Sequence, residues 1–256
     1  MTSQAVASGA LRVQRIGAVL AGSLVTLLMM DATTSSAGSD SSERERRQRM
    51  VEQQIEGRGI ADPRVLEAMR SVPRHLFVPE QLADRAYDDS PLPIGNRQTI
   101  SQPYIVAIMS ELLQTSADDT VLEIGTGSGY QAAVLSRLVR NVYSIEIVEE
   151  LADRARKTLA QHDYDNVVVV TGDGYRGLPE HAPFDGIIVT AAPATIPQPL
   201  IDQLAVGARL VIPVGEGDQQ LMVLERDASG VESRKVIPVR FVPMTGEARK
   251  PGGHAN

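Results

Sequence analysis

A glycine-rich turn between a short apolar strand and a helix is the feature that most constrains this chain of 256 residues. Residues 121–124 (VLEI) are predicted to form a buried strand, and three alternate glycines follow at Gly125, Gly127 and Gly129. Residues 131–139 then have the pattern of an amphipathic helix. Glycines let the backbone approach a ligand closely, and free N–H groups at a helix start favour polar or anionic groups. The pattern therefore predicts an α/β fold with a nucleotide-binding turn, although a purely structural glycine turn would have the same residues.

The spacing of the glycines argues against a dinucleotide site. The dinucleotide fingerprint needs glycine or alanine at its sixth position, where the helix packs closely on the strand. The large side chain of Tyr130 stands there instead, the third glycine comes one position earlier, and the acidic Glu123 precedes the loop. An acidic residue followed by three alternate glycines resembles the first motif of class I S-adenosylmethionine-dependent methyltransferases.

Two further acidic residues stand at the ends of predicted strands. Residues 141–147 are predicted to form the second strand, and Glu146 lies about 20 residues beyond the first glycine, where a carboxylate can bind ribose hydroxyls. Residues 167–171 are predicted to form the third strand, which runs into Asp173 between two glycines. A carboxylate at that edge suits an adenine amino group, although a plain turn would have the same sequence.

Composition removes several classes of protein. The chain has no cysteine, which excludes disulfides, thiolate metal sites and cysteine nucleophiles. Its four histidines have no metal-like spacing, so no metal is expected. A net charge of −7 argues against generic binding to nucleic acid or to anionic membranes. No Gly-x-Ser-x-Gly elbow occurs, which argues against a serine hydrolase.

Residues 1–40 differ in composition from the rest of the chain. Arg12 and Arg15 precede an uncharged stretch, residues 16–30, and small residues follow up to Ala37. This is the pattern of a signal peptide, and a disordered leader or a mis-assigned start would have the same residues. A functional signal within residues 1–37 would predict a periplasmic or exported protein. Otherwise we expect the cytoplasm, where S-adenosylmethionine is made.

The remainder is predicted to comprise three parts: an N-terminal helical segment with a substrate loop over residues 41–114, an α/β core over residues 115–245, and a flexible tail over residues 246–256. In the first part we expect helices over residues 43–57, from Pro63 to Pro73 with Asp62 as N-cap, and over residues 104–113. An extended segment is expected over residues 74–79 and a loop over residues 91–103.

Strands alternate with helices in the predicted core. The fourth and fifth strands are expected at residues 184–190 and 208–214, and a hairpin at residues 219–225 and 235–242. This alternation predicts a mostly parallel, twisted sheet with an antiparallel C-terminal hairpin and helices on both faces.

Five separated segments resemble bacterial protein-L-isoaspartate O-methyltransferases, within a likeness that extends from about Met50 to Thr245. They are VPRHLFVP (72–79), AYDD (86–89), QTISQP (98–103), TAAP (190–193) and VRFVP (239–243). The resemblance implies a Rossmann-like methyltransferase fold, S-adenosylmethionine as methyl donor, isoaspartyl peptides and proteins as substrates, and a monomer. The chain departs from the family at Asn96-Arg97, where many relatives have an aromatic or small residue followed by glycine.

The resemblance also assigns roles to single residues. Ser101 takes the position of the active-site serine, although by spacing alone it would be a helix N-cap. The residues implied to face the cofactor are Thr99, Ile100, Glu123, Gly125, Thr126, Gly127, Ser128, Gly129, Glu146, Asp173 and Gly174. Among them, the glycine loop would hold the methionine part, Glu146 the ribose, and Asp173 with Gly174 the adenine.

The implied substrate needs no general base. An isoaspartyl residue has a free α-carboxylate, whose pKa of about 3.3–3.7 leaves it ionised at neutral pH. Orienting this carboxylate against the sulfonium methyl can lower the activation barrier by about 7–11 kcal/mol. We therefore expect Ser101 to donate a hydrogen bond to the substrate and not to act as a nucleophile. The methyl ester would close to a succinimide, and hydrolysis would return some normal aspartate.

Two alternatives remain at the level of sequence. One is another carboxyl or small-molecule methyltransferase on the same sheet, and the other is a non-catalytic nucleotide-binding module. The second would not need the intact set of Glu123, Glu146 and Asp173. Enzymes that methylate amino nitrogens typically have Asn/Asp-Pro-Pro-Tyr/Phe after the fourth strand, whereas this chain has residues 190–193 (TAAP) there.

Overall fold

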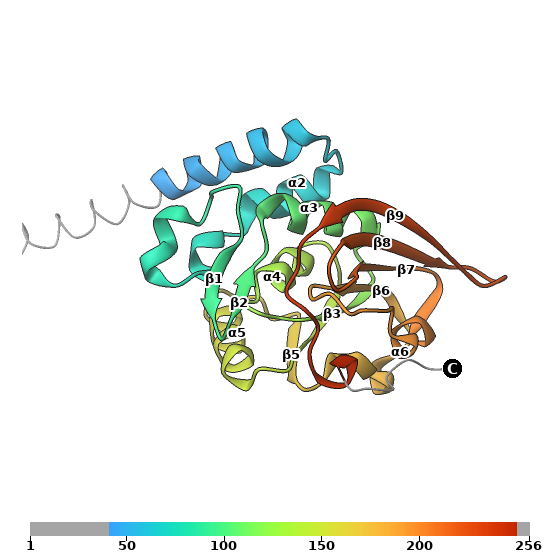
Figure 1. Cartoon of the computed structure of the whole chain (residues 1–256). Helices are drawn as coiled ribbons and strands as arrows, with labels where there is room; N and C mark the ends of the chain where they lie inside the picture. Colours follow the sequence, from blue (N-terminus) through green and yellow to red (C-terminus); the bar gives the residue numbers. More distant parts are fainter. Residues whose placement is uncertain (1–40, 250–256) are drawn as a thin grey trace, which may run out of the picture. The chain divides into compact units, whose positions relative to one another are not determined.

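The computed structural model describes residues 41–249 (Figure 1). The predicted leader and residues 250–256 of the predicted tail lie outside this range. The second of the two units of the chain begins at Arg44. All elements described below belong to that second unit, except that the first helical stretch covers residues 41–50.

A seven-stranded sheet in the order β5-β4-β3-β6-β7-β8-β9 forms the centre of the fold. Its parallel strands are β3 (Thr120–Ile124), β4 (Asn141–Glu146), β5 (Val167–Thr171), β6 (Phe184–Val189) and β7 (Leu204–Val214). The strands β8 (Gln219–Arg226) and β9 (Val231–Val239) continue it as an antiparallel hairpin. The predicted mixed sheet is confirmed. β7 and β9 each begin four residues before the expected start, and β9 ends at Val239, because residues 240–242 leave the sheet.

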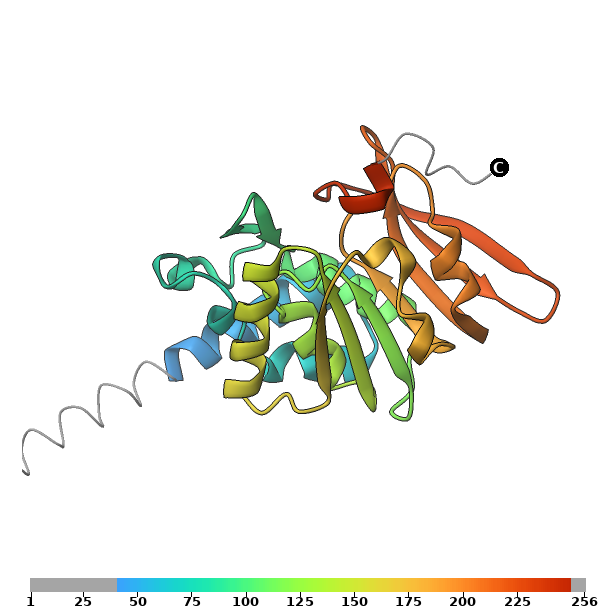
Figure 2. The ribbon, with the colours of Figure 1, turned by 90° about the horizontal axis from the view of Figure 1, so that it is seen from below.

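Both faces of the sheet are covered, and β3 shows how. Val121 packs in one core cluster, whereas Leu122 and Ile124 pack in the other, because neighbouring residues of a strand point to opposite faces. The first cluster contains side chains from four helices: α2 (Pro63–Ser71), α3 (Pro103–Leu113), α4 (Tyr130–Ser136) and α5 (Glu149–Gln161). The second includes α6 (Gln198–Asp202), and Figure 2 shows helices on both sides of the strands.

The helix after the glycine turn differs from the expected amphipathic helix. α4 ends at Ser136, and its residues from Tyr130 to Leu135 are all buried. Its one buried amide side chain, Gln131, donates a hydrogen bond to the Ser110 hydroxyl of α3 at 2.9 Å. The helix therefore lies inside the core, between the sheet and the N-terminal helices.

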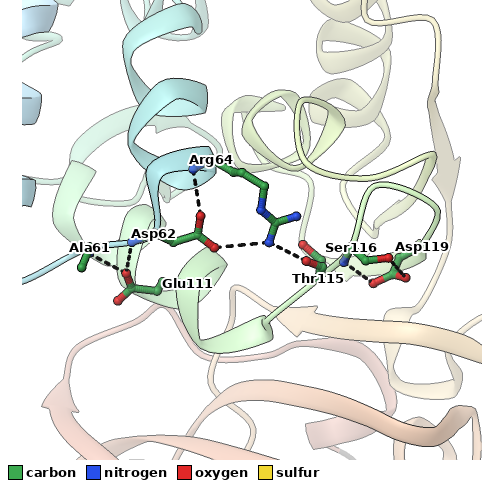
Figure 3. Close-up of polar contacts among 7 residues, drawn as sticks. All are labelled: Ala61, Asp62, Arg64, Glu111, Thr115, Ser116 and Asp119. Atoms are coloured by element: carbon green, nitrogen blue, oxygen red, sulfur yellow. Dashed lines mark hydrogen bonds and ion pairs between the residues drawn. The ribbon is translucent and has the colours of Figure 1, made fainter.

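The start of α2 is bound to the end of α3 (Figure 3). Asp62 caps α2 by accepting a hydrogen bond from the backbone of Arg64 at 2.8 Å, which confirms the predicted N-cap. Glu111 of α3 accepts hydrogen bonds from the backbone N–H groups of Ala61 and Asp62 at 2.7 and 2.8 Å. Arg64 also donates to the carbonyl of Thr115 at 2.6 Å. These bonds join the N-terminal helices to the segment that leads into β3.

Two predictions in the N-terminal segment were wrong. The first helix was expected to end at Gly57, but a π-turn (Val51–Ile55) and a 3-10 turn (Glu56–Arg58) continue it to Gly59, which has φ 95°. Residues 74–79 were expected to be extended, but Arg74–Phe77 is a 3-10 turn. Tertiary burial explains the second difference, because the fully buried Arg74 donates to the carbonyl of Ala86 at 2.7 Å and lies over the ring of Tyr130.

The segment expected as a loop over residues 91–103 contains a hairpin. Strands β1 (Leu92–Gly95) and β2 (Gln98–Ile100) pair antiparallel, and Asn96 and Arg97 form the turn with φ 51° and 58°. Positive φ at both central residues is the requirement of a type I′ hairpin, which normally favours Asn-Gly. Two bonds to α5 hold it: Asn96 donates to Glu150 at 3.2 Å, and Arg154 donates to the carbonyl of Ile94.

Within residues 41–249, no helix is long and apolar enough to cross a membrane.

Candidate active site

The glycine turn brings backbone into the space at the carboxyl end of the sheet. Gly125, Gly127 and Gly129 all have positive φ, at 98°, 54° and 87°. A Cβ atom on Gly125 would lie 2.4 Å from Oγ1 of Thr190, the residue that follows β6. The Thr190 hydroxyl donates to the carbonyl of Gly125 at 2.6 Å, so the turn and the end of β6 are in direct contact.

A cavity of about 70 Å³ lies above these strand ends. Its walls come from β2, β3 and β4, from the turns after β3, β5 and β6, and from the chain that follows β9. The lining residues are Gln98, Thr99, Ile124, Gly125, Gly127, Ile145, Glu146, Ile147, Asp173, Gly174, Thr190, Ala191, Val242, Pro243, Met244 and Thr245. This is the edge where open α/β sheets bind ligands, beside the strand at which the order reverses. We refer to it as the loop cavity.

A second, larger cavity of about 480 Å³ adjoins the first. It is lined by Arg58, Pro91, Thr99, Ser101, Gln102, Tyr104, Ile105, Thr190, Ile237, Pro238, Val239, Arg240, Phe241 and Val242. We refer to it as the serine cavity. Thr99, Thr190 and Val242 line both cavities and therefore form the wall between them.

Ser101 lies in the serine cavity and is not the N-cap of α3. That position belongs to Gln102, which makes no side-chain capping bond. The half-buried hydroxyl of Ser101 has no hydrogen-bond partner among residues 41–249. A hydroxyl without an internal partner in a cavity wall is available to a ligand.

The carboxylate of Glu146 is bound to the glycine turn. One oxygen accepts a hydrogen bond from the backbone of Gly127 at 2.8 Å, and the other accepts one from Val148 at 3.0 Å. Each carboxylate oxygen has a second lone pair, so these two bonds leave acceptor capacity towards the loop cavity. Glu146 thus fixes the shape of the turn as well as lining the cavity.

Asp173 connects the loop cavity to the C-terminal segment. Its carboxylate accepts from the backbone of Tyr175 at 3.0 Å and from the backbone of Glu247 at 2.7 Å. Glu247 also pairs with Arg176 at 2.7 and 2.9 Å. Figure 1 shows the chain returning from β9 to this short 3-10 turn, Gly246–Arg249. The tail expected from residue 246 is therefore structured as far as Arg249, because Asp173 and Arg176 bind it.

The model of the protein-L-isoaspartate(D-aspartate) O-methyltransferase family matches residues 45–249 of this chain. The chain belongs to this family. Membership makes it a methyltransferase of the protein-L-isoaspartate type with S-adenosylmethionine as methyl donor, as the resemblance of the five segments implied.

Curated relatives in the family cover most of the chain. A protein-L-isoaspartate O-methyltransferase from Synechococcus sp. is 59% identical over 77% of this chain and 84% of its own length. The one from Gloeobacter violaceus is 56% identical over 80% of this chain and 100% of its own length. These relatives favour the isoaspartyl activity over the alternative of another methyltransferase specificity.

Solved structures support the fold. A protein-L-isoaspartate O-methyltransferase superposes with a TM-score of 0.71 at 28% identity, over 79% of this chain and 66% of the other. A Plasmodium falciparum structure in complex with S-adenosyl-L-homocysteine gives 0.68 at 24% identity, over 78% and 98% of the two chains. The predicted Rossmann-like methyltransferase fold is confirmed.

Five of the residues expected to face the cofactor do not line the loop cavity. Ile100 lies in the hydrophobic core, and Gly129 packs against Leu159 of α5. Ser128 lines a separate small cavity beside α5, and its hydroxyl accepts from the backbone of Tyr130 at 3.3 Å. Glu123 and Thr126 are buried beneath the turn.

Other lining residues received no role from the sequence. Thr190, Ala191 and Val242 belong to the segments TAAP and VRFVP, which carried the resemblance to the family but were given no residue-by-residue role. Arg58, Tyr104 and Arg240 line the serine cavity. Only the resemblance of their segments to the family could have pointed to Thr190, Ala191 and Val242. Arg58, Tyr104 and Arg240 come from distant segments, and no spacing in the sequence brings them together.

A chain of buried hydroxyl groups links Glu123 to the turn. Ser144 of β4 donates a hydrogen bond to the Glu123 carboxyl, and its hydroxyl also contacts that of Thr126. Burial raises the pKa of Glu123 from 4.5 to about 8, against the lowering effect of the bond from Ser144, and the charge of Glu146 raises it slightly further. Glu123 is therefore a neutral acid at pH 7 beneath the glycine turn.

Glu123→Gln is expected to flatten the dependence of stability on pH. Between pH 4.5 and about 8 the unfolded side chain is ionised while the folded one keeps its proton. Unfolding then releases a proton, so the wild-type free energy of unfolding falls by about 1.4 kcal/mol per pH unit from this group. Glutamine resembles the protonated acid and lacks this loss. Urea unfolding at about pH 5, 7 and 8.5 measures it, and a parallel decline of both proteins would contradict the assignment.

Proposed function

We propose that this enzyme holds S-adenosylmethionine in the loop cavity and an isoaspartyl peptide in the serine cavity, with methyl transfer across the wall between them. The observation that carries the proposal is the shared wall of Thr99, Thr190 and Val242. A methyl donor on one side and an acceptor on the other would meet there. The reaction joins the methyl carbon to an oxygen of the α-carboxylate and breaks its bond to sulfur, leaving S-adenosylhomocysteine and a methyl ester.

The residues of the loop cavity fit the donor. Gly125 and Gly174 pack so closely that a Cβ atom would collide with Thr190 or Ile124, at 2.4 and 2.3 Å, so glycine is required at both lining positions. Glu146 has acceptor capacity for ribose hydroxyls, and Asp173 lies where it can accept from an adenine amino group. A cavity of about 70 Å³ is smaller than the roughly 300 Å³ at which small-molecule pockets begin. Cofactor entry therefore requires the C-terminal segment or the β1–β2 hairpin to move outward.

The serine cavity supplies orientation and not acid–base chemistry. The reacting carboxylate of the substrate is already ionised, so no proton has to be removed. No histidine or lysine lines the cavity. The Ser101 hydroxyl, which has no partner among residues 41–249, would donate to one carboxylate oxygen and leave the other facing the wall. Holding the reacting atoms in line can account for about 7–11 kcal/mol of the barrier.

The product of the transfer is an activated ester. Methanol leaves more readily than water from a neighbouring acyl carbon, so the backbone amide can close to a succinimide without the enzyme. Hydrolysis of that ring gives a mixture that includes normal aspartate. The repair function thus follows from making the ester on the α-carboxylate.

We also propose that the enzyme acts in the cytoplasm as a monomer and without nucleic acid. Its methyl donor is made in the cytosol, and its net charge of −7 disfavours contact with a phosphate backbone. The single experiment that tests the proposed function is the transfer of a labelled methyl group from S-adenosylmethionine to an isoaspartyl peptide, beside the same peptide with normal aspartate.

A further inference from the structure

We infer that Arg240 selects isoaspartyl substrates that have an acidic side chain one or two residues from the damaged position. The inference rests on the proposed function, since it takes the serine cavity as the place where the peptide binds. It goes beyond that function by naming a preferred sequence context and the residue that reads it.

The charge of the serine cavity is the first observation. The charged residues that line it are Arg58 and Arg240, and none of the lining residues is acidic. The whole chain has a net charge of −7, so a cationic cavity stands out against the rest of the molecule. A positively charged cavity attracts negative groups and raises their local concentration.

The two arginines differ in their partners. Arg58 pairs with Asp89 at 3.2 Å and lies 3.5 Å from the centre of the Tyr104 ring, so its charge is balanced and its side chain is fixed. The exposed guanidinium of Arg240 forms no hydrogen bond or ion pair with any of residues 41–249. The uncompensated positive charge of the cavity is therefore that of Arg240.

Arg240 lies at a distance from the proposed site of methyl transfer. Val242 forms part of the wall where the methyl would cross, and the two residues of chain from Arg240 to Val242 can span at most about 7 Å. An extended peptide advances by the same length over two residues. An acidic side chain of the peptide that contacts Arg240 would therefore lie one or two residues from the isoaspartyl residue. The isoaspartyl carboxylate itself would be bound by Ser101.

A scan of acidic neighbours tests this inference. The substrates are isoaspartyl peptides with glutamine at the two positions on each side, and four variants with one glutamine changed to glutamate. Wild-type enzyme with S-adenosylmethionine is expected to favour at least one glutamate peptide by about fivefold in kcat/KM, through KM, as for a partly exposed ion pair. The preference should shrink at about 0.5 M salt, because exposed charges are screened.

The variants Arg240→Gln and Arg234→Gln complete the design. Arg234 is exposed on β9, the strand that leads to Arg240, but it lies six residues or about 20 Å back along the chain and does not line the cavity. Arg240→Gln should abolish the preference, so that the glutamate peptides and the neutral peptide have the same kcat/KM, whereas Arg234→Gln should keep the preference.

Three results would overturn the inference. The first is an equal kcat/KM of wild-type enzyme on all five peptides, and the second is a preference that survives Arg240→Gln. The third is an equal fall in the kcat/KM of Arg240→Gln on every peptide, which would place Arg240 at the reacting carboxylate. If wild-type enzyme methylated none of the isoaspartyl peptides, the proposed function would fail and the inference with it.

Discussion

Ser101→Ala is expected to lower kcat on an isoaspartyl peptide by roughly ten- to a hundredfold while leaving the affinity for S-adenosylmethionine unchanged. The hydroxyl has no internal partner among residues 41–249, so its removal breaks no bond that holds the fold. What is lost is one hydrogen bond to a charged carboxylate, which is worth about 1.5–3 kcal/mol. Because Ser101 lines the serine cavity and not the loop cavity, cofactor binding should be spared.

Steady-state kinetics together with calorimetry of S-adenosylhomocysteine binding measure the two effects separately. Ser136→Ala is a matched control, because that hydroxyl bonds the carbonyl of Ala133 on α4 and lines neither cavity. An unchanged kcat would refute the role of Ser101. A loss of cofactor affinity as large as the loss of kcat would show that the serine supports the fold of the site and not the substrate.

Asp173→Ala is expected to raise the dissociation constant of S-adenosylmethionine by roughly tenfold or more, with a smaller effect on kcat at saturating donor. The substitution removes a carboxylate from the wall of the loop cavity and, with it, the acceptor of two backbone N–H groups. One of those donors is Glu247, so the turn that follows the cavity-lining residues 242–245 is released as well. Each lost bond to a charged acceptor contributes about 1.5–3 kcal/mol.

Arg176→Ala distinguishes two causes of weaker cofactor binding: the loss of the Asp173 carboxylate and the release of the C-terminal turn. Arg176 pairs with Glu247 on the solvent side, and exposed ion pairs contribute little. This variant should therefore bind the cofactor nearly as well as wild type. An unaltered dissociation constant in Asp173→Ala would refute its assignment, and an equal weakening in both variants would assign the effect to the turn alone.

Much of the fold could be read from local patterns. β3, the turn at Gly125 and the strand-end carboxylates Glu146 and Asp173 are close in sequence or repeat with a strand–helix period, and the structure brings all of them to one edge of the sheet. The β1–β2 hairpin escaped prediction because Asn96 and Arg97 both adopt positive φ without a glycine. That conformation is maintained by contacts with α5, 50 or more residues away, which no local pattern reveals.

Local patterns did not predict the surroundings of two site segments. Glu123 was expected to face the cofactor, but the register of β3 turns it inward, where Ser144 of the next strand meets it. The C-terminal segment was expected to fray because it is polar, yet Asp173 binds its backbone. In both cases the partner that decides the position comes from a distant strand or turn, which no local pattern reveals.

The measurement that tests the account most directly is the fate of a labelled methyl group. Full-length enzyme is given labelled S-adenosylmethionine and two peptides that differ only in an isoaspartyl or a normal aspartyl linkage. The account predicts label on the isoaspartyl peptide alone, released as methanol in mild alkali because the bond formed is an ester. Equal labelling of both peptides, or label that withstands alkali, would contradict the claim that the serine cavity presents a free α-carboxylate to the methyl donor.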